Sequence, residues 1–424
     1  MLQITRIKQD KLNVINGLKK KRFPEAEKEI ERVLALDQQR RETQTSLDNL
    51  LAESNQMARK IGQLIKEGKS SEAEEAKTKT SDLKRQSKDL REKLSQLENQ
   101  LNELLLNIPN IPHPDVPQGT DAVDNEIIYQ NEVKVDLTEG ALPHWELVKK
   151  YDIIDFELGN KITGAGFPVY KNKGARIQRA LVNFFLDQAL EAGYQEIQPP
   201  VLINQESGLG TGQLPDKEGQ MYQLKEENYY LIPTAEVPVT NIYRDSIIDK
   251  KNLPIKNVAY SLCFRREAGS WGSHVRGLNR LHQFDKVEIV QIHTPENSYL
   301  GFHEMCEYVK GLLQQLELPF REVRLCGGDL GFTSTITHDM EVYAAAQDKW
   351  LEVSSVSNFE TYQAHRLKLR YRTEDKKTRL LHTLNGSALA LPRVLAALLE
   401  NNQSEKGVKI PKVLIPYAGF EWIE

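Results

Sequence analysis

The sequence predicts an α+β protein, in which an N-terminal antiparallel two-helix coiled-coil arm precedes a body built on a mainly antiparallel sheet flanked by helices. Two observations support this division. Apolar residues recur every three or four positions through residues 47–104, a region nearly free of Pro and Gly. Beyond it, short strand patterns mix irregularly with helices and loops, which fits α+β better than regular strand–helix repetition.

The composition indicates a globular protein of two or three domains. The chain has 424 residues, of which 39% are hydrophobic and 27% charged. We expect a cytoplasmic location and no membrane contact, because the N-terminus has no apolar signal core and no long apolar run follows. The three cysteines, Cys263, Cys306 and Cys326, are widely spaced, so neither a disulfide framework nor a zinc site is expected.

Charge is distributed unevenly along the chain. Residues 1–110 contain 22 Lys and Arg against 18 Asp and Glu, a net charge of +4. The whole chain carries −4, so the remainder carries −8 and a general nucleic-acid binder is not indicated. The asymmetry has two interpretations: a polyanionic partner for the first segment only, or an ordinary solvated helix surface.

The predicted coiled-coil seam is interrupted once, at residues 66–71, where Gly68 and a serine pair can end one helix and begin the next. Two helices of about 40 residues joined by so short a turn fold back antiparallel, and the hairpin should be roughly 60 Å long. A parallel dimeric coiled coil is the alternative, which the turn makes less favourable. The seam comprises Leu47, Leu51, Ser54, Ala58, Ile61, Ile65, Ala73, Ala76, Thr80, Leu83, Ser87, Leu90, Leu94, Leu97, Leu101 and Leu104.

Four prolines within residues 108–117 mark a domain boundary, because proline cannot continue a helix. We therefore expect an arm domain at 1–107, a linker and the start of the body at 108–170, and the main body at 171–424. Within the body, the pattern predicts a helix over 175–192, stopped by Gly193, and a strand over 194–203. A second helix is predicted over 391–401, entered through Pro392.

Two alternating runs, FRRE at 264–267 and LHQFDKVE at 281–288, are separated by a glycine-containing loop. In strands, Arg265 and Glu267 would share a face, as would Phe284, Lys286 and Glu288. An arginine can bind phosphate, a phenyl ring can stack on a purine, and a carboxylate can accept from an exocyclic amine. These residues predict a nucleotide site without a Walker loop. A cross-strand ladder of surface ion pairs is the alternative.

The same runs resemble motif 2 of the class II aminoacyl-tRNA synthetases, with FRRE followed by HQF at 282–284. The segment at about 175–203 is similar to motif 1, and the strand and helix at about 380–401, with LNGSALALPR at 384–393, to motif 3. Within the class, the chain resembles the bacterial-type seryl-tRNA synthetases in PTAE at 233–236, HQFDKVE at 282–288, EVSS at 352–355, SNF at 357–359 and NGS at 385–387. The N-terminal hairpin resembles their tRNA-binding arm, so the similarity extends along essentially the whole chain.

The resemblance implies a ligase that forms seryl-adenylate and transfers serine to tRNA(Ser), and to tRNA(Sec) as well. It implies a class II catalytic domain and a homodimer that binds tRNA across its subunits. The implied cofactor is Mg²⁺ bound with ATP, and no zinc is implied. A synthetase-like ligase that charges a carrier protein is an alternative, although such proteins lack the long arm. A coiled-coil adaptor with an inactive synthetase body is a second alternative, which the intact charged residues of the motifs argue against.

Individual roles are also implied. Arg265 binds the α-phosphate, Glu267 the adenine amino group and Arg393 the γ-phosphate; Phe284 stacks on adenine, and Arg280 lies at the pyrophosphate end. The implied catalytic residues are Arg265 and Arg393. The implied ATP-binding residues are Arg265, Arg266, Glu267, Arg280, Phe284, Glu352, Val353, Ser354, Ser355 and Arg393, of which Glu352 and Ser355 also hold the Mg²⁺. The implied serine-binding residues are Thr234, Ala235, Glu236, Arg265, Glu288, Asn385 and Ser387.

The sequence departs from the family pattern at three places. The motif 2 loop reads SWGSHVRG at 270–277, where a small residue and an Arg-Asp pair are more usual. Ala388 stands where a second glycine is common, and Val356 replaces a frequent cysteine. None of these changes removes a charged catalytic group, but the unusual Trp271 and His274 leave the contact with the tRNA acceptor stem open.

Overall fold

The computed structural model describes residues 1–137, 139–267 and 276–424. It divides into two compact units. The arm unit comprises Leu2–Lys19 and Phe23–Pro109, and the body unit comprises Asn110–Glu424 with Met1 and Lys20–Arg22. No helix within the described residues is long and apolar enough to cross a membrane.

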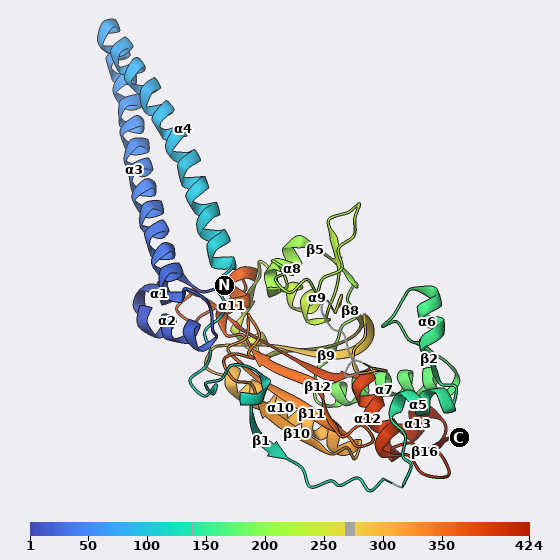
Figure 1. The fold of residues 1–424 in the computed structure, drawn as a ribbon. Coiled ribbons are helices and arrows are strands. Elements are labelled where there is room, and N and C mark those ends of the chain that lie inside the picture. The colour runs from blue at the N-terminus through green and yellow to red at the C-terminus, as the bar shows by residue number, and fades with distance from the viewer. Residues whose placement is uncertain (138, 268–275) are drawn as a thin grey trace. The chain divides into compact units, whose positions relative to one another are not determined.

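The arm unit is helical throughout. Two short helices, α1 (Ile4–Gln9) and α2 (Lys11–Lys20), precede the long helices α3 (Ala26–Lys66) and α4 (Ser70–Leu106). The long helices contain 41 and 37 residues and pack together along an antiparallel hairpin (Figure 1). Gly68, with a φ of +74°, supplies the left-handed turn between them, and the Lys69 N–H returns to the Leu64 carbonyl at 3.0 Å. The predicted hairpin is therefore confirmed.

Two small polar residues in the seam, Thr80 and Ser87, are accommodated by bonds within their own helix. Thr80 Oγ1 donates to the Ala76 carbonyl at 2.8 Å, and Ser87 Oγ donates to the Leu83 carbonyl at 2.7 Å. Both hydroxyls are buried, and these bonds satisfy their donors without requiring water in the seam. The heptad pattern thus continues through both interruptions.

The predicted seam is wrong near the tip of the hairpin. Ala58 and Ile65 are exposed, and Ile65 retains 58% of its accessible surface. Met57 and Leu64 take their place beside the predicted Ile61 and pack against Ala73 and Ala76 at the start of α4. A straight α-helix has about 3.6 residues per turn, whereas a heptad repeat corresponds to about 3.5. Positions predicted from a strict heptad repeat therefore move gradually around the helix surface over successive turns.

The body unit is organised around one eight-stranded sheet (Figure 1). Its strands lie in the order β1 (Glu126–Gln130), β10 (Phe320–Arg324), β11 (Ile336–Ala344), β12 (Lys349–Asn358), β15 (His382–Ala390), β9 (Gln283–His293), β8 (Ile255–Phe264) and β4 (Gln195–Glu196). All neighbours are antiparallel except β4 and β8, which are parallel. This mainly antiparallel sheet confirms the predicted α+β class.

Alternation along the central strands separates an apolar face from a polar one. Gly386 lies on the apolar face, where an added Cβ would meet Val356 Cγ2 at 3.1 Å and Met305 Cε at 3.4 Å. Met305 belongs to α10 (Ser298–Gln315), whose buried side chains join those of α7 (Asn172–Glu191) and α12 (Leu391–Asn401) in the main hydrophobic core. The residues on either side of Gly386 therefore point to the opposite, polar face.

Two of the three secondary-structure elements predicted for the body are confirmed, and one of these two helices begins earlier than expected. The helix expected from 175 begins at Asn172, and Gly193, with a φ of +84°, follows its end. The helix over 391–401 is found as predicted. The single strand expected over 194–203 is wrong. Two short strands in different sheets, β4 and β5 (Leu202–Asn204), stand on either side of Pro199 and Pro200, which have no N–H to donate to a ladder.

Smaller elements surround the main sheet. The remaining α-helices are α5 (His144–Lys150), α6 (Phe156–Ile162), α8 (Gln205–Thr211), α9 (Glu236–Asn241), α11 (Thr361–Leu367) and α13 (Ile415–Ala418). The remaining strands are β2 (Ile154–Asp155), β3 (Val169–Tyr170), β6 (Tyr229–Leu231), β7 (Ile247–Asp249), β13 (Arg370–Arg372), β14 (Thr378–Leu380), β16 (Val408–Lys409) and β17 (Trp422–Ile423). They form one three-stranded and three two-stranded sheets, β5 pairing with β6 beside the polar face.

Candidate active-site cleft

Two adjoining cavities lie over the polar face of the main sheet. The first has a volume of about 500 Å³ and the second about 1420 Å³. Six side chains line both of them: Arg265, Glu267, Arg280, Lys286, Glu352 and Ser387. The two cavities are therefore parts of one continuous cleft, whose ends differ in chemistry.

The first cavity gathers cationic and aromatic side chains from segments far apart in the chain. Of the sequence-predicted residues, it is lined by Arg265, Glu267, Arg280, Phe284, Glu352, Val353, Ser387 and Arg393. The guanidinium of Arg265 lies 5.3 Å from the centroid of the Phe284 ring. Phe284, Lys286 and Glu288 all face the cleft, as their alternation along β9 predicted.

The first of the two alternating runs is not a strand beyond Phe264. β8 ends there, and Glu267 has a φ of +49°. The Arg265 N–H still donates to the His282 carbonyl at 2.9 Å, which holds this segment beside the start of β9. Arg265 and Glu267 consequently both face the cleft although the regular ladder has ended.

Arg393 is fixed at the mouth of the first cavity by the start of α12. Pro392 occupies the first turn of that helix, where a missing N–H costs no hydrogen bond. Arg393 donates from Nη1 to the Glu352 carbonyl at 2.7 Å and from Nε to the Asn279 carbonyl at 3.0 Å. Arg280, next to Asn279, forms an ion pair with Glu267. Several cations thus converge where a polyanionic ligand would be stabilised.

The second cavity contains a compact cluster of polar side chains. The Asn385 amide donates to Glu236 Oε2 at 3.0 Å and to Glu288 Oε1 at 2.9 Å, so it bridges two carboxylates. Ser387 Oγ donates to Glu288 Oε2 at 3.3 Å, and Thr234 Oγ1 accepts from the Glu236 N–H at 3.2 Å. This end of the cleft offers oxygen acceptors and hydroxyls suited to a small polar cation.

Two further residues complete this cluster. Lys286 Nζ lies 2.6 Å from Glu288 Oε2, and both side chains are almost fully buried. Gln363 on α11 donates to Glu236 Oε1 at 2.7 Å and accepts from Thr383. Alternation had placed Lys286 on this face without a specific role, whereas Gln363 was missed at the level of sequence. Gln363 carries no local signal, because only the fold brings α11 to the cleft.

Burial gives Glu236 unusual proton affinity. Its side chain is 5% exposed, and burial raises its pKa to about 7, with a smaller contribution in the same direction from the charge of Glu288. The hydrogen bond from Gln363 opposes this shift. Glu236 therefore changes charge near neutral pH in the unliganded cleft.

Three predicted site residues do not line the cleft, and part of the predicted loop is not described. Arg266 is exposed and lines a separate cavity with Asp216 and Tyr222. Ala235 packs in a small apolar cluster, and the buried Ser354 donates to the Ser387 carbonyl at 2.5 Å. Residues 270–275 of the motif 2 loop, including Trp271 and His274, lie outside the described residues.

A group of oxygen ligands lies in the second cavity. Glu352, Ser355 and Asp339 all line it, and Asp339 faces Ser355 across the β11–β12 pair. Asp339 Oδ1 is buried and has no hydrogen-bond partner among the described residues. Carboxylate and hydroxyl oxygens are the ligands that Mg²⁺ prefers, so these residues fit a magnesium ion accompanied by phosphates.

A second group with metal-binding residue types lies in the core. Cys306, Glu322 and His338 are buried with their ligand atoms close together. Their polar atoms already satisfy one another, since His338 Nδ1 lies 2.8 Å from Glu322 Oε1 and Lys310 lies 3.1 Å from Glu322 Oε2. Burial raises the pKa of Cys306, which disfavours the thiolate that zinc requires. We interpret the group as a paired core network, and the absence of zinc stays a prediction.

Comparison with known families assigns both units of the chain. Residues 1–112 match the family model for the seryl-tRNA synthetase N-terminal domain. Residues 220–402 match the model for the class II tRNA synthetase core domain that serves the G, H, P, S and T enzymes. The second match contains the cleft residues described above.

Curated relatives and solved structures match along the full length. A serine–tRNA ligase from Salinibacter ruber is 48% identical over 99% of this chain and 98% of its own. One from Alkaliphilus oremlandii is 47% identical over 98% of both chains. The crystal structure of seryl-tRNA synthetase from Pyrococcus horikoshii complexed with ATP has a TM-score of 0.93 at 33% identity, covering 100% of this chain and 99% of that one.

The buried Lys286–Glu288 pair yields a stability prediction. Lys286→Met removes the cation and leaves the Glu288 carboxylate buried without its ion pair, which should lower the free energy of unfolding by about 3–5 kcal/mol. Thermal unfolding of the purified variant measures this loss. Adding Glu288→Gln to the same variant removes the uncompensated charge and should recover part of it. An unchanged midpoint in Lys286→Met would contradict the proposed electrostatic role.

Proposed function

The chain belongs to the seryl-tRNA synthetases, and we propose that its cleft activates L-serine with ATP to form seryl-adenylate and then transfers serine to the 3′-terminal adenosine of tRNA(Ser). The observation that carries this proposal is the division of one cleft into a cationic, aromatic end and a carboxylate–amide–hydroxyl end. Arg265 lines both ends, at the position where an α-phosphate would meet an amino-acid carboxylate.

The cationic end is assigned to ATP. Arg265 binds the α-phosphate, Glu267 accepts from the adenine amino group, and Phe284 stacks on the adenine. The Arg265 guanidinium already lies over the Phe284 ring. Arg280 and Arg393 neutralise the pyrophosphate end. A serine carboxylate oxygen forms a bond to the α-phosphorus as the bond to the bridging oxygen of pyrophosphate breaks. The carboxylate is already ionised, so the site has to supply alignment and charge neutralisation rather than a general base.

The polar end is assigned to serine. The ammonium group binds between Glu236 and Glu288, whose separation is fixed by the bridging amide of Asn385. Thr234 and Ser387 complete the lining beside them. Alanine would leave buried polar groups unpaired, and sites of this type reject such analogues strongly.

The magnesium ion is assigned to Glu352 and Ser355, with Asp339 close by. These residues offer oxygen ligands on the cleft wall beside the arginines. When bound with ATP, Mg²⁺ supplies neutralisation of charge on the phosphates. The protein's own contribution is to hold Arg393 against the Glu352 carbonyl, so that cation and carboxylate approach the nucleotide together.

The arm unit is proposed to bind the body of the tRNA, and the homodimer is proposed to bind tRNA across its subunits. The exposed cations of the arm unit include Arg59, Lys60 and Lys84, which can neutralise phosphates. A ligase that charges a carrier protein remains the alternative for the body alone, and the arm argues against it. Cytoplasmic location and charging of tRNA(Sec) stay predictions.

Arg265→Ala tests the assignment of the ATP end. Loss of a preorganised cation at the α-phosphate should slow serine-dependent ATP–pyrophosphate exchange on the order of 10²-fold or more. Arg266→Ala is the matched control, because Arg266 faces a different cavity. This variant should exchange pyrophosphate at nearly the wild-type rate. Pyrophosphate exchange by Arg265→Ala at nearly the wild-type rate would contradict the assignment of this end of the cleft to ATP.

Glu236 predicts a pH dependence of serine binding. Because its pKa is raised to about 7, the protonated fraction grows as the pH falls through that value, and only the ionised form attracts the serine ammonium. The KM for serine should therefore rise as the pH is lowered from roughly 8 to 6. Glu236→Gln should raise KM at every pH and flatten the profile. A wild-type KM that stays constant over this range would count against the assigned role.

The arm makes a separate prediction about tRNA. Replacing Arg59, Lys60 and Lys84 together with alanine should weaken tRNA binding and reduce its dependence on salt, because fewer counterions are released. Pyrophosphate exchange should be unchanged, since the exchange residues are in the body unit. Fluorescence anisotropy with labelled tRNA at several salt concentrations measures the first effect. Unaltered affinity and salt slope would assign tRNA binding to other surfaces.

A further inference from the structure

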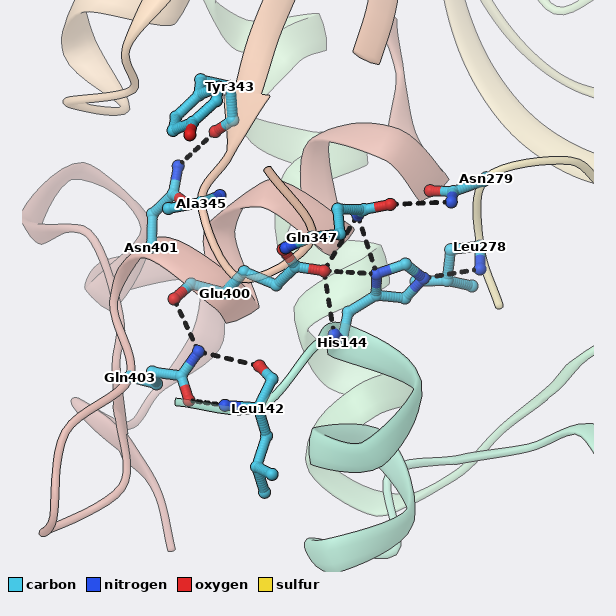
Figure 2. A network of polar contacts seen from close by, with 10 residues as sticks. All are labelled: Leu142, His144, Leu278, Asn279, Tyr343, Ala345, Gln347, Glu400, Asn401 and Gln403. Carbon is cyan, nitrogen blue, oxygen red and sulfur yellow. Dashed lines mark hydrogen bonds and ion pairs between the residues drawn. The ribbon is translucent and has the colours of Figure 1, made fainter. Parts of the chain in front are cut away.

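A buried histidine–glutamate pair joins the helices α5 and α12, away from the strands of the synthetase motifs. His144 begins α5 and Glu400 lies near the end of α12, and both residues are fully buried (Figure 2). His144 Nδ1 lies 2.7 Å from Glu400 Oε1, and the Leu278 N–H donates to His144 Nε2 at 2.9 Å. A backbone N–H can only donate, so Nε2 is the acceptor and Nδ1 carries the proton toward Glu400. The pair thus fixes one tautomer of the ring.

The loop that returns from motif 2 is shaped to reach this ring. Gly277 has a φ of +70°, and an added Cβ would lie 2.3 Å from His144 Nε2. The residue before it, Arg276, forms a 3.2 Å ion pair with Glu146 and stacks over Trp145 at 5.1 Å. Three consecutive loop residues, 276–278, are therefore held by the first three residues of α5.

The held segment continues directly into the ATP end of the cleft. Leu278 and Asn279 line the first cavity, and the Asn279 carbonyl accepts from Arg393 Nε at 3.0 Å. The Asn279 amide donates to Gln347 at 2.9 Å, and Gln347 donates to Glu400 at 2.9 Å. Figure 2 shows the contacts of Asn279, Gln347 and Glu400 beside the His144 ring. Glu400 and Arg393 belong to the same helix, so this network connects the loop to α12 at two places.

We propose that His144, oriented by Glu400, is a positioning residue for ATP binding, an inference that rests on the function proposed above. It acts through Leu278 and Asn279 rather than by touching the nucleotide. By accepting from the Leu278 N–H, it sets where the Asn279 carbonyl holds Arg393 and where Arg280 enters the cleft. Among the described residues, no hydrogen bond or ion pair joins this network to Glu236, Glu288 or Asn385 at the serine end.

Two substitutions of His144 distinguish its role as acceptor from the Leu278 N–H from its role as donor to Glu400. His144→Asn places an amide where Nδ1 donates but leaves the Leu278 N–H without an acceptor. His144→Gln extends to the position of Nε2 and can accept from that N–H. In pyrophosphate exchange, His144→Asn should raise the KM for ATP on the order of 10-fold, with the KM for serine changed less than about twofold. His144→Gln should restore most of the ATP affinity.

The control is Asn401→Ala, on the same helix and in the same network. Asn401 bonds to the backbone of Tyr343 and Ala345 rather than to the loop, so its loss should lower thermal stability and leave both KM values near wild type. If His144→Asn does not fold, Gly277→Ala perturbs the same contact and should give the same KM split. Equal rises in both KM values, or no recovery with His144→Gln, would overturn the inference. A wild-type protein that fails to exchange pyrophosphate with serine would instead overturn the proposed function.

Discussion

The cleft depends on one amide that holds two buried carboxylates together. Two like charges of this kind repel, and burial removes the water that would screen them. Asn385 bonds to both Glu236 and Glu288, Lys286 neutralises one of them, and Gln363 bonds to the other. This arrangement requires one sheet face to be polar, and it forces the hydrophobic core with α10 onto the opposite face.

The same constraint explains why the site is assembled from distant parts of the chain. The central strands β9, β12 and β15 supply alternating side chains on the polar face, and α12 continues from β15 to place Arg393 at the cleft mouth. The ATP end has no such regular support, because β8 stops at Phe264 before Arg265. Backbone contacts from neighbouring segments replace the ladder there. The His144–Glu400 pair belongs to this second kind of support, which positions loops rather than strands.

Much of this architecture follows from local patterns in the sequence. Period-two alternation placed Phe284 and Glu288 in the cleft, and the glycine turn within a heptad seam predicted the hairpin. Drift of the helical repeat misplaced Ile65, because the heptad pattern was extended along a straight helix. The ATP-binding role expected for Arg266 came from the family resemblance alone, whereas alternation had placed its neighbours Arg265 and Glu267 on one shared face.

Other residues were invisible because their partners are remote in sequence. Gln363 lies 127 positions from Glu236, and Glu400 lies 256 positions from His144. Neither contact leaves a periodic or spacing signal. Their importance comes from burial, since an unpaired polar group inside the body costs more than its hydrogen bond contributes.

The central claim is that the bridged carboxylates and adjacent hydroxyls recognise serine by its polar groups. It is tested most directly by ATP–pyrophosphate exchange of the unmodified protein with serine and alanine compared at equal concentrations. The account predicts a kcat/KM for serine roughly 10³-fold or more above that for alanine, because alanine leaves buried groups unpaired. A ratio below about tenfold would mean that the pocket selects by size alone, and would contradict it.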